Sequence, residues 1–152
     1  MALIQVHDKS FEPFIAAAEI REQIQRLGKQ LNEDYQQKKP LLLPILNGSF
    51  IFAADLIREL KVDCRVSFVK HASYQGTQSS GQLNTLIGLN ESLFNQDIII
   101  IEDIMDTGLT LSKVINEFGT LGVKSVEIVT LVRKAPARAH AVQPKYIGFD
   151  ID

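Results

Sequence analysis

Two adjacent carboxylates and a turn of small, hydroxylated residues follow one strongly apolar stretch of the chain. The sequence there is Ile98-Ile99-Ile100-Ile101-Glu102-Asp103-Ile104-Met105-Asp106-Thr107-Gly108-Leu109-Thr110. Carboxylates accept hydrogen bonds from a vicinal diol and also ligate Mg²⁺, a cation that prefers oxygen ligands. A turn of small residues before a helix can direct backbone N–H groups at a phosphate. The combination indicates a site for a sugar phosphate such as ribose 5-phosphate.

The same stretch resembles the phosphoribosyl-pyrophosphate motif of type I phosphoribosyltransferases. The similarity consists of the apolar strand, the Glu102-Asp103 pair and the Asp-Thr-Gly-x-Thr loop. The resemblance implies that the pair holds the ribose hydroxyls and, through these hydroxyls or water, Mg²⁺. It also implies that the 5-phosphate is bound by the loop residues Thr107, Gly108, Leu109 and Thr110. The alternative is an ordinary helix cap after a strand, which leaves the acidic pair without a role.

Asp106, at the edge of the loop, is the candidate catalytic residue. In the family reaction, N9 of the base replaces pyrophosphate at the anomeric carbon, and positive charge develops on the sugar in the transition state. By resemblance Asp106 faces N7 of a purine, where a carboxylate accepts the proton as the base becomes nucleophilic. The other role for Asp106 is to cap the following helix, and the two roles are compatible.

Two earlier segments resemble the hypoxanthine-guanine phosphoribosyltransferases in particular. Asn47-Gly48 is similar to their pyrophosphate loop, in which exposed backbone amides after a strand bind a diphosphate. The family usually has lysine at the position of Asn47, so a cationic contact is missing there. Ser73 and Tyr74 lie in a polar loop that resembles the family's flexible lid, which closes over the reacting groups and excludes water.

The last part of the chain carries the residues that would select the base. Lys134 matches the family's purine-contacting lysine, which donates to the exocyclic oxygen of a 6-oxopurine, although Arg133 competes for this role. Arg138 matches an arginine near the phosphates. Residues 146–150 resemble the segment that leads into the base-stacking region, and the sequence ends at Asp152. The stacking residue of the family, and an aspartate near Mg²⁺, therefore have no counterpart.

Alternating apolar segments predict an α/β fold with one domain over residues 1–152. Helical periodicity is expected over residues 13–35, 50–60 and 110–118, with Gly119 as the last helix's stop. Strands are expected over residues 41–46, 62–69, 97–101, 126–132 and 146–151, with a hairpin arm at 83–89. Pro44 conflicts with the first strand because proline cannot donate to a ladder. The resemblance implies an open, mostly parallel twisted sheet with helices on both faces and a lid loop.

Composition excludes several other classes of protein. The formal net charge of −2 gives no basic surface for nucleic acid. A single cysteine, Cys64, and three scattered histidines favour a reducing cytoplasm over a disulfide-stapled or zinc-bound fold. Cys64 itself is expected to be a small buried apolar residue. No stretch approaches the roughly 20 apolar residues of a membrane span.

The sequence predicts a purine-salvage enzyme that joins hypoxanthine, or guanine, to phosphoribosyl pyrophosphate with Mg²⁺. Three alternatives stay open: a non-catalytic regulator that senses phosphoribosyl pyrophosphate, a transferase for another base, and a generic nucleotide-binding α/β domain. The retained Asp106 and Lys134 favour catalysis over the regulator. The resemblance further implies a homodimer or homotetramer, and the sequence does not rank hypoxanthine, guanine and xanthine.

Overall fold

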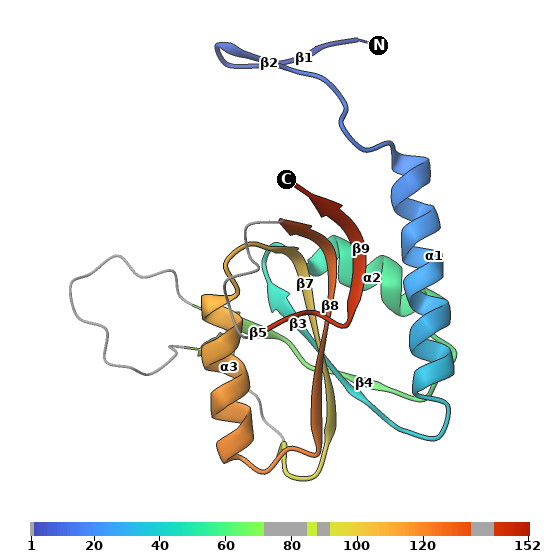
Figure 1. Ribbon diagram of the computed structural model, residues 1–152, viewed down its shortest axis with the longest axis vertical. Helices are drawn as coiled ribbons and strands as arrows, with labels where there is room; N and C mark the ends of the chain where they lie inside the picture. Colours follow the sequence, from blue (N-terminus) through green and yellow to red (C-terminus); the bar gives the residue numbers. More distant parts are fainter. Residues whose placement is uncertain (1, 72–84, 88–91, 135–141) are drawn as a thin grey trace, which may run out of the picture.

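The computed structural model describes residues 2–71, 85–87, 92–134 and 142–152, which build a mixed sheet between helices (Figure 1). The sheet has the strand order β6-β5-β3-β7-β8-β9, and β4 also pairs with β3. All its pairings are parallel except that of β5 with β6. Its strands are β3 (Leu41–Leu46), β4 (Arg65–Val66), β5 (Val69–His71), β6 (Thr85–Ile87), β7 (Asp97–Met105), β8 (Ser125–Lys134) and β9 (Tyr146–Ile151).

Helices cover both faces of this sheet, as the sequence predicts. Helices α1 (Ala17–Asp34) and α2 (Phe50–Glu59) pack on one face, and α3 (Leu109–Thr120) packs on the other (Figure 1). The four isoleucines of β7 alternate between the two layers. Ile99 and Ile101 belong to the cluster under α1 and α2, whereas Ile98 and Ile100 belong to the cluster under α3. A strand buried on both faces needs such a continuous apolar run.

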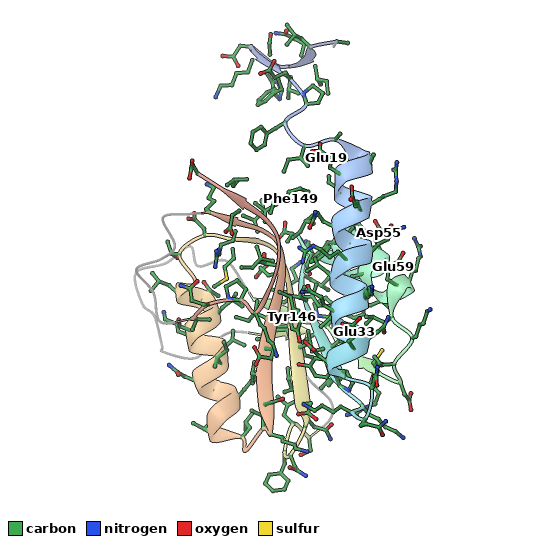
Figure 2. All side chains as sticks on the ribbon, turned by 45° about the vertical axis from the view of Figure 1, so that its right-hand side comes forward. Glu19, Glu33, Asp55, Glu59, Tyr146 and Phe149 are labelled. Atoms are coloured by element: carbon green, nitrogen blue, oxygen red, sulfur yellow. The ribbon has the colours of Figure 1, made fainter. Side chains whose placement is uncertain are left out.

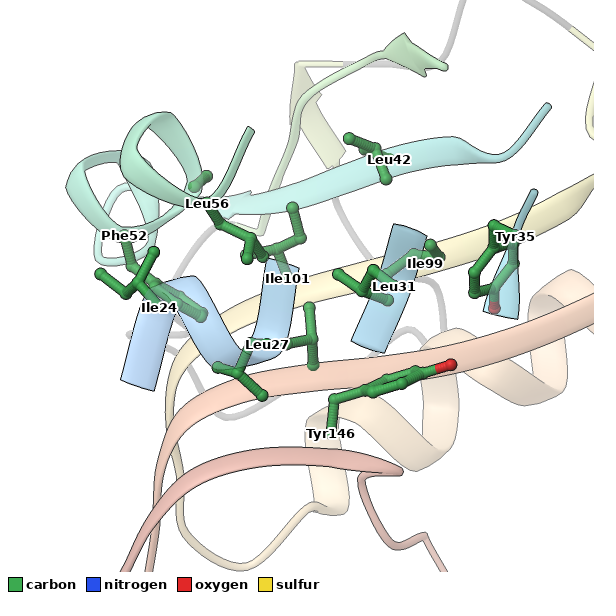
Figure 3. Close-up of a cluster of buried hydrophobic side chains, with 12 residues drawn as sticks. Ile24, Leu27, Leu31, Tyr35, Leu42, Phe52, Leu56, Ile99, Ile101 and Tyr146 are labelled. Atoms are coloured by element: carbon green, nitrogen blue, oxygen red, sulfur yellow. The ribbon is translucent and has the colours of Figure 1, made fainter. Parts of the chain in front are cut away.

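Helix α1 is amphipathic, and its apolar face packs on the sheet. Its buried residues are spaced at helical intervals along one face: Ile24, Leu27, Gly28 and Leu31. Figure 3 shows the side chains of this face lying against residues of β3, β7 and α2. The helix begins at Ala17 and not at residue 13, because the Glu19 carboxylate accepts a 2.8 Å hydrogen bond from the Ala16 N–H and so fixes the first turn.

The prediction of one continuous strand over residues 62–69 is wrong. The chain instead forms β4, which ends at Val66 opposite Leu42, and β5, which begins at Val69 opposite Ile45. Pro44 of β3 falls in the gap between these two pairings. A proline has no N–H to donate, and neither β4 nor β5 pairs with this residue, which is in register with Ile101 of β7 on the other side of β3. The conflict seen in the sequence is thus resolved by a break in the neighbouring strand.

Two element ends also differ from the sequence expectations. Gly119 does not end the last helix, since α3 continues to Thr120 and the following left-handed glycine is Gly122, with φ of +73°. Strand β7 continues past Ile101 to Met105, so Glu102 and Asp103 lie within the carboxyl-terminal part of the strand and not after it. Strand β8 likewise extends to Lys134.

An N-terminal hairpin was not foreseen from the sequence. Strands β1 (Ile4–Val6) and β2 (Lys9–Phe11) pair with each other and stand away from the sheet and its helices (Figures 1 and 2). All six strand residues are exposed. Among the described residues, no helix is long and apolar enough to span a membrane.

Candidate functional site

The acidic pair lies at the carboxyl end of β7, between β3 and β8. Open α/β sheets bind ligands at this edge of the sheet. The two carboxylates of the pair lie close enough to interact with each other, because a hydrogen bond between their side chains contributes to raising the pKa of Glu102.

Asp103 brings the loop between β3 and α2 into this site. A Cβ added to Gly48 would lie 2.8 Å from Oδ2 and 3.0 Å from Oδ1 of Asp103. The backbone at Gly48 therefore lies so close to the carboxylate that a residue with a side chain would not fit without a shift of Asp103. The peptide bond between Leu46 and Asn47 is cis. Asn47 and Gly48 are exposed, whereas Ser49 is fully buried and its hydroxyl donates to the Ile45 carbonyl at 2.7 Å.

Glu102 lines a hollow beside the loop that follows β7. The hollow has a volume of about 190 Å³, and its lining is Glu102, Ile104, Met105, Asp106, Thr107, Gly108, Leu109, Thr110 and Leu111. Burial, together with the adjacent Asp103 carboxylate, raises the pKa of Glu102 to about 8. The carboxylate thus stands where a diol donor or a cation would stabilise its charged form.

The loop from Asp106 to Gly108 leads directly into α3. Gly108 is the N-cap residue with φ of +73°, a conformation that favours glycine, and it has no side chain of its own to cap the helix. The Leu109 N–H donates weakly to Thr107 Oγ1 at 3.4 Å, and Ser112 Oγ donates to the Gly108 carbonyl at 3.0 Å. Within the part of the chain that the structure describes, no carbonyl accepts from the N–H of Thr107, Gly108 or Thr110. These groups, at the positive end of α3, are available to an anion.

Asp106 is exposed beside this loop and is not the cap of α3. The cap role weighed from the sequence is therefore wrong, because the helix begins after Gly108 and the N-cap position has no side-chain hydrogen bond. Asp106 lines the hollow with Glu102, so its carboxylate is available to a ligand there.

Arg133 and Lys134, the two cations that compete as base contacts, have different surroundings at the carboxyl end of β8. Arg133 donates from Nε to Asp150 Oδ1 at 2.6 Å and from Nη2 to Oδ2 at 2.9 Å. Lys134 is exposed, and no ion pair or hydrogen bond engages it among the described residues. The structure therefore leaves Lys134, and not Arg133, uncompensated at this edge.

Comparison with known proteins decides the family. Residues 16–152 match the phosphoribosyl transferase domain model. The chain is 36% identical over 138 residues to hypoxanthine-guanine phosphoribosyltransferase of Bacillus subtilis, covering 90% of this chain and 77% of that protein. The chain belongs to the phosphoribosyltransferase family. It is also 34% identical over 145 residues to the bifunctional protein TilS/HprT of Listeria innocua, covering 95% of this chain but only 22% of that protein.

Solved structures of the phosphoribosyltransferase family agree with this assignment. A hypoxanthine phosphoribosyltransferase from Staphylococcus aureus superimposes with a TM-score of 0.84 at 36% identity, covering 92% of this chain and 77% of that one. The predicted fold and the predicted family are thus confirmed, and the chain is a phosphoribosyltransferase of the purine-salvage type.

The structure brings part of the predicted phosphoribosyltransferase site together. Asn47-Gly48, the acidic pair and the loop from Asp106 to Thr110 meet at one edge of the sheet. Lys134 lies at the end of the next strand. Ser73, Tyr74 and Arg138 lie outside the described residues, so their predicted contacts stay predictions.

Sequence reasoning missed the partners of Arg133. Asp150 pairs with it across β8 and β9, where the two residues are Cα partners. A signal existed, since an aspartate inside an apolar strand-type segment is unusual. Cys64, in contrast, packs partly buried against the core under α1 and α2, as expected.

The acidic pair could help to hold Mg²⁺ only together with other ligands. Among the described residues, no three acidic, histidine or cysteine side chains are grouped as a metal site. Two carboxylates supply too few ligands for the octahedral shell of Mg²⁺. The donor set fits an ion whose remaining ligands come from water and from a phosphorylated sugar.

Proposed function

We propose that the chain transfers the phosphoribosyl group of phosphoribosyl pyrophosphate to hypoxanthine, and also to guanine, releasing pyrophosphate. The observation that carries the proposal is the shared edge of the sheet. Two carboxylates lie there beside backbone N–H groups, at the start of α3, for which no described residue supplies a carbonyl acceptor. A ribose 5-phosphate offers a diol for the first and a phosphate for the second.

The phosphate subsite is formed by Thr107, Gly108, Leu109 and Thr110. Their N–H groups and hydroxyls, with the dipole of α3, bind the 5-phosphate and fix the sugar's position. Because the carboxylates repel phosphate, Glu102 and Asp103 bind the hydroxyl side of the same sugar. The same two carboxylates would hold Mg²⁺ through these hydroxyls or water, and the ion would supply charge neutralisation for the pyrophosphate leaving group.

The pyrophosphate subsite is assigned to the loop at Asn47 and Gly48. The close approach of Gly48 to Asp103 supports this assignment, because Asp103 is proposed to bind the ribose hydroxyls, next to which the leaving group of phosphoribosyl pyrophosphate begins. Ser73 and Tyr74 are proposed to cover this side. Arg138 is proposed to contact the phosphates.

The base subsite uses two oppositely charged groups. Lys134 donates a hydrogen bond to the exocyclic oxygen of a 6-oxopurine. Its ammonium group has no acceptor, so it cannot accept a hydrogen bond from the amino group of adenine. Asp106 accepts the proton from N7 while N9 attacks the anomeric carbon. The active molecule is proposed to be a cytoplasmic homodimer or homotetramer, with residues 1–152 as one domain.

A direct assay tests the proposal. Purified protein is incubated with phosphoribosyl pyrophosphate, Mg²⁺ and, separately, hypoxanthine, guanine, xanthine or adenine, and the nucleoside monophosphates are separated by chromatography. We expect inosine and guanosine monophosphates and no adenosine monophosphate. Binding of phosphoribosyl pyrophosphate without any product from the four bases would instead establish the regulator.

A further inference from the structure

Arg133 forms a two-pronged ion pair at the point where β8 ends. Its Nε–Oδ1 distance to Asp150 is 2.6 Å, and its Nη2–Oδ2 distance is 2.9 Å. The third nitrogen, Nη1, donates to Gln143 Oε1 at 3.3 Å. All three guanidinium nitrogens are thus used. Gln143 precedes β9 and Asp150 lies within it, so one arginine ties β8 to two points of the neighbouring segment.

This ion pair differs from the others in the described part of the chain. The Arg133 side chain is 26% exposed, whereas the lysine or arginine of each other pair is 53% to 78% exposed. Arg58, for example, reaches Asp55 through a single 3.2 Å contact on α2. Two parallel charge-assisted bonds of a partly buried arginine hold a fixed geometry, whereas exposed single contacts contribute little.

The fixed geometry has its effect on Lys134, the next residue. Lys134 is the last residue of β8 and pairs in register with Ile151 of β9. Strand ends fray unless something holds them, and a lysine side chain has large rotamer freedom. The clasp formed by Arg133, Asp150 and Gln143 holds the backbone from which Lys134 projects. It also neutralises the charge of Arg133.

We propose that Arg133 is a positioning residue for Lys134, and that its ion pair with Asp150 keeps the Lys134 ammonium as the one base-directed cation at the end of β8. This inference rests on the proposed function, because it takes Lys134 as the contact to the exocyclic oxygen of the purine. Arg133 itself does not touch the base. A misplacement of about 1 Å at such a contact can cost up to about 100-fold in rate.

The test replaces Arg133 by lysine, which keeps the charge and loses the planar fork. We expect Arg133→Lys to raise KM for hypoxanthine about tenfold, a loss of about 1.4 kcal/mol of binding. KM for phosphoribosyl pyrophosphate should change less than about twofold, because the phosphate loop is untouched. Arg58→Lys, at another arginine that pairs with an aspartate, is the matched control and should leave both KM values at the wild-type level.

A double-mutant cycle separates positioning from general stability. In a Lys134→Met background, the ammonium is already gone, so adding Arg133→Lys should raise KM for hypoxanthine by less than about twofold further. Asp150→Asn is the second way to open the clasp and should reproduce the effect of Arg133→Lys. Melting temperatures of all variants, measured in parallel, show that each one is folded.

The outcomes are distinct. If the wild-type protein makes no inosine monophosphate, the proposed function and this inference fail together. If the wild-type protein is active but Arg133→Lys and Asp150→Asn retain the wild-type KM for hypoxanthine, only the inference is overturned. It is also overturned if the effects of Arg133→Lys and Lys134→Met multiply, since Arg133 would then act independently of Lys134.

Discussion

Gly48 and Asp103 meet across the carboxyl end of the sheet, with room for a hydrogen but not for a methyl group between them. A Cβ at Gly48 would stand 2.8 Å from Asp103 Oδ2, closer than real Cβ contacts occur. The contact joins the loop after β3 to the acid pair of β7. It therefore makes the two proposed subsites, for pyrophosphate and for ribose, parts of one surface.

Gly48→Ala should damage catalysis more than folding. The added methyl group meets the free end of a short side chain, so the Asp103 carboxylate turns aside at little cost to stability. We expect kcat/KM for phosphoribosyl pyrophosphate to fall about 10- to 100-fold, with a free energy of unfolding within about 1 kcal/mol of wild type. Gly119→Ala is the control, since nothing lies within 4 Å of its added Cβ. An unchanged kcat/KM in Gly48→Ala would contradict the close contact.

Asp106→Asn should reduce turnover without weakening binding of phosphoribosyl pyrophosphate. The side chain lines the hollow, is exposed and does not cap α3, so its removal leaves the phosphate loop intact. We expect kcat to fall about 10²- to 10⁴-fold, the range for loss of a general base. Isothermal titration with phosphoribosyl pyrophosphate measures the binding separately. Turnover near the wild-type level would reject the base role.

Glu102→Gln should make the ligand-free protein more stable at alkaline pH. The pKa of Glu102 is about 8 in the folded chain and near 4.5 in the unfolded chain, mainly because of burial. The folded protein therefore binds the proton more tightly, and stability is lost as pH rises from about 4.5 through 8. Glutamine cannot ionise and avoids this loss.

The melting temperatures of the two proteins should thus coincide near pH 4 and separate with rising pH. Each pH unit between the two pKa values corresponds to about 1.4 kcal/mol, and we expect roughly 2 kcal/mol in total after allowing for partial contact with solvent. In a domain of this size that amounts to about 4–8 °C above pH 8. If the melting temperatures of the two proteins instead change in parallel from pH 4 to 9, Glu102 ionises in the folded protein as easily as in the unfolded chain.

Tyr146→Phe should cost stability and leave catalysis intact. The Tyr146 hydroxyl donates to Asp34 Oδ2 at 2.6 Å, which joins the end of α1 to the start of β9, away from the acidic pair. The freed carboxylate keeps contact with solvent and with Lys145 at 3.9 Å. We expect a loss of about 1 kcal/mol in urea unfolding and an unchanged kcat. A large fall in kcat would indicate that this end of the sheet communicates with the site.

Most of the fold follows from local patterns. The helical spacing of Ile24, Leu27 and Leu31 and the apolar runs of β3 and β7 specify their elements without reference to the rest of the chain. The sequence-based expectations were wrong where the structure of one segment depends on a second segment or where its periodicity is weak. The break between β4 and β5 depends on which residue of β3 lacks a donor, and the exposed hairpin of β1 and β2 has no strong periodicity to mark it.

The sequence alone determined that the acidic pair lies beside the loop from Asp106 to Thr110, because both belong to one strand-loop-helix unit and local geometry brings them together. Only the tertiary structure decided that Gly48 lies against Asp103 and that Asp150 pairs with Arg133, and not with Lys134. These contacts depend on the order and register of parallel strands. Burial of both faces of the sheet sets that register, and no short segment contains it.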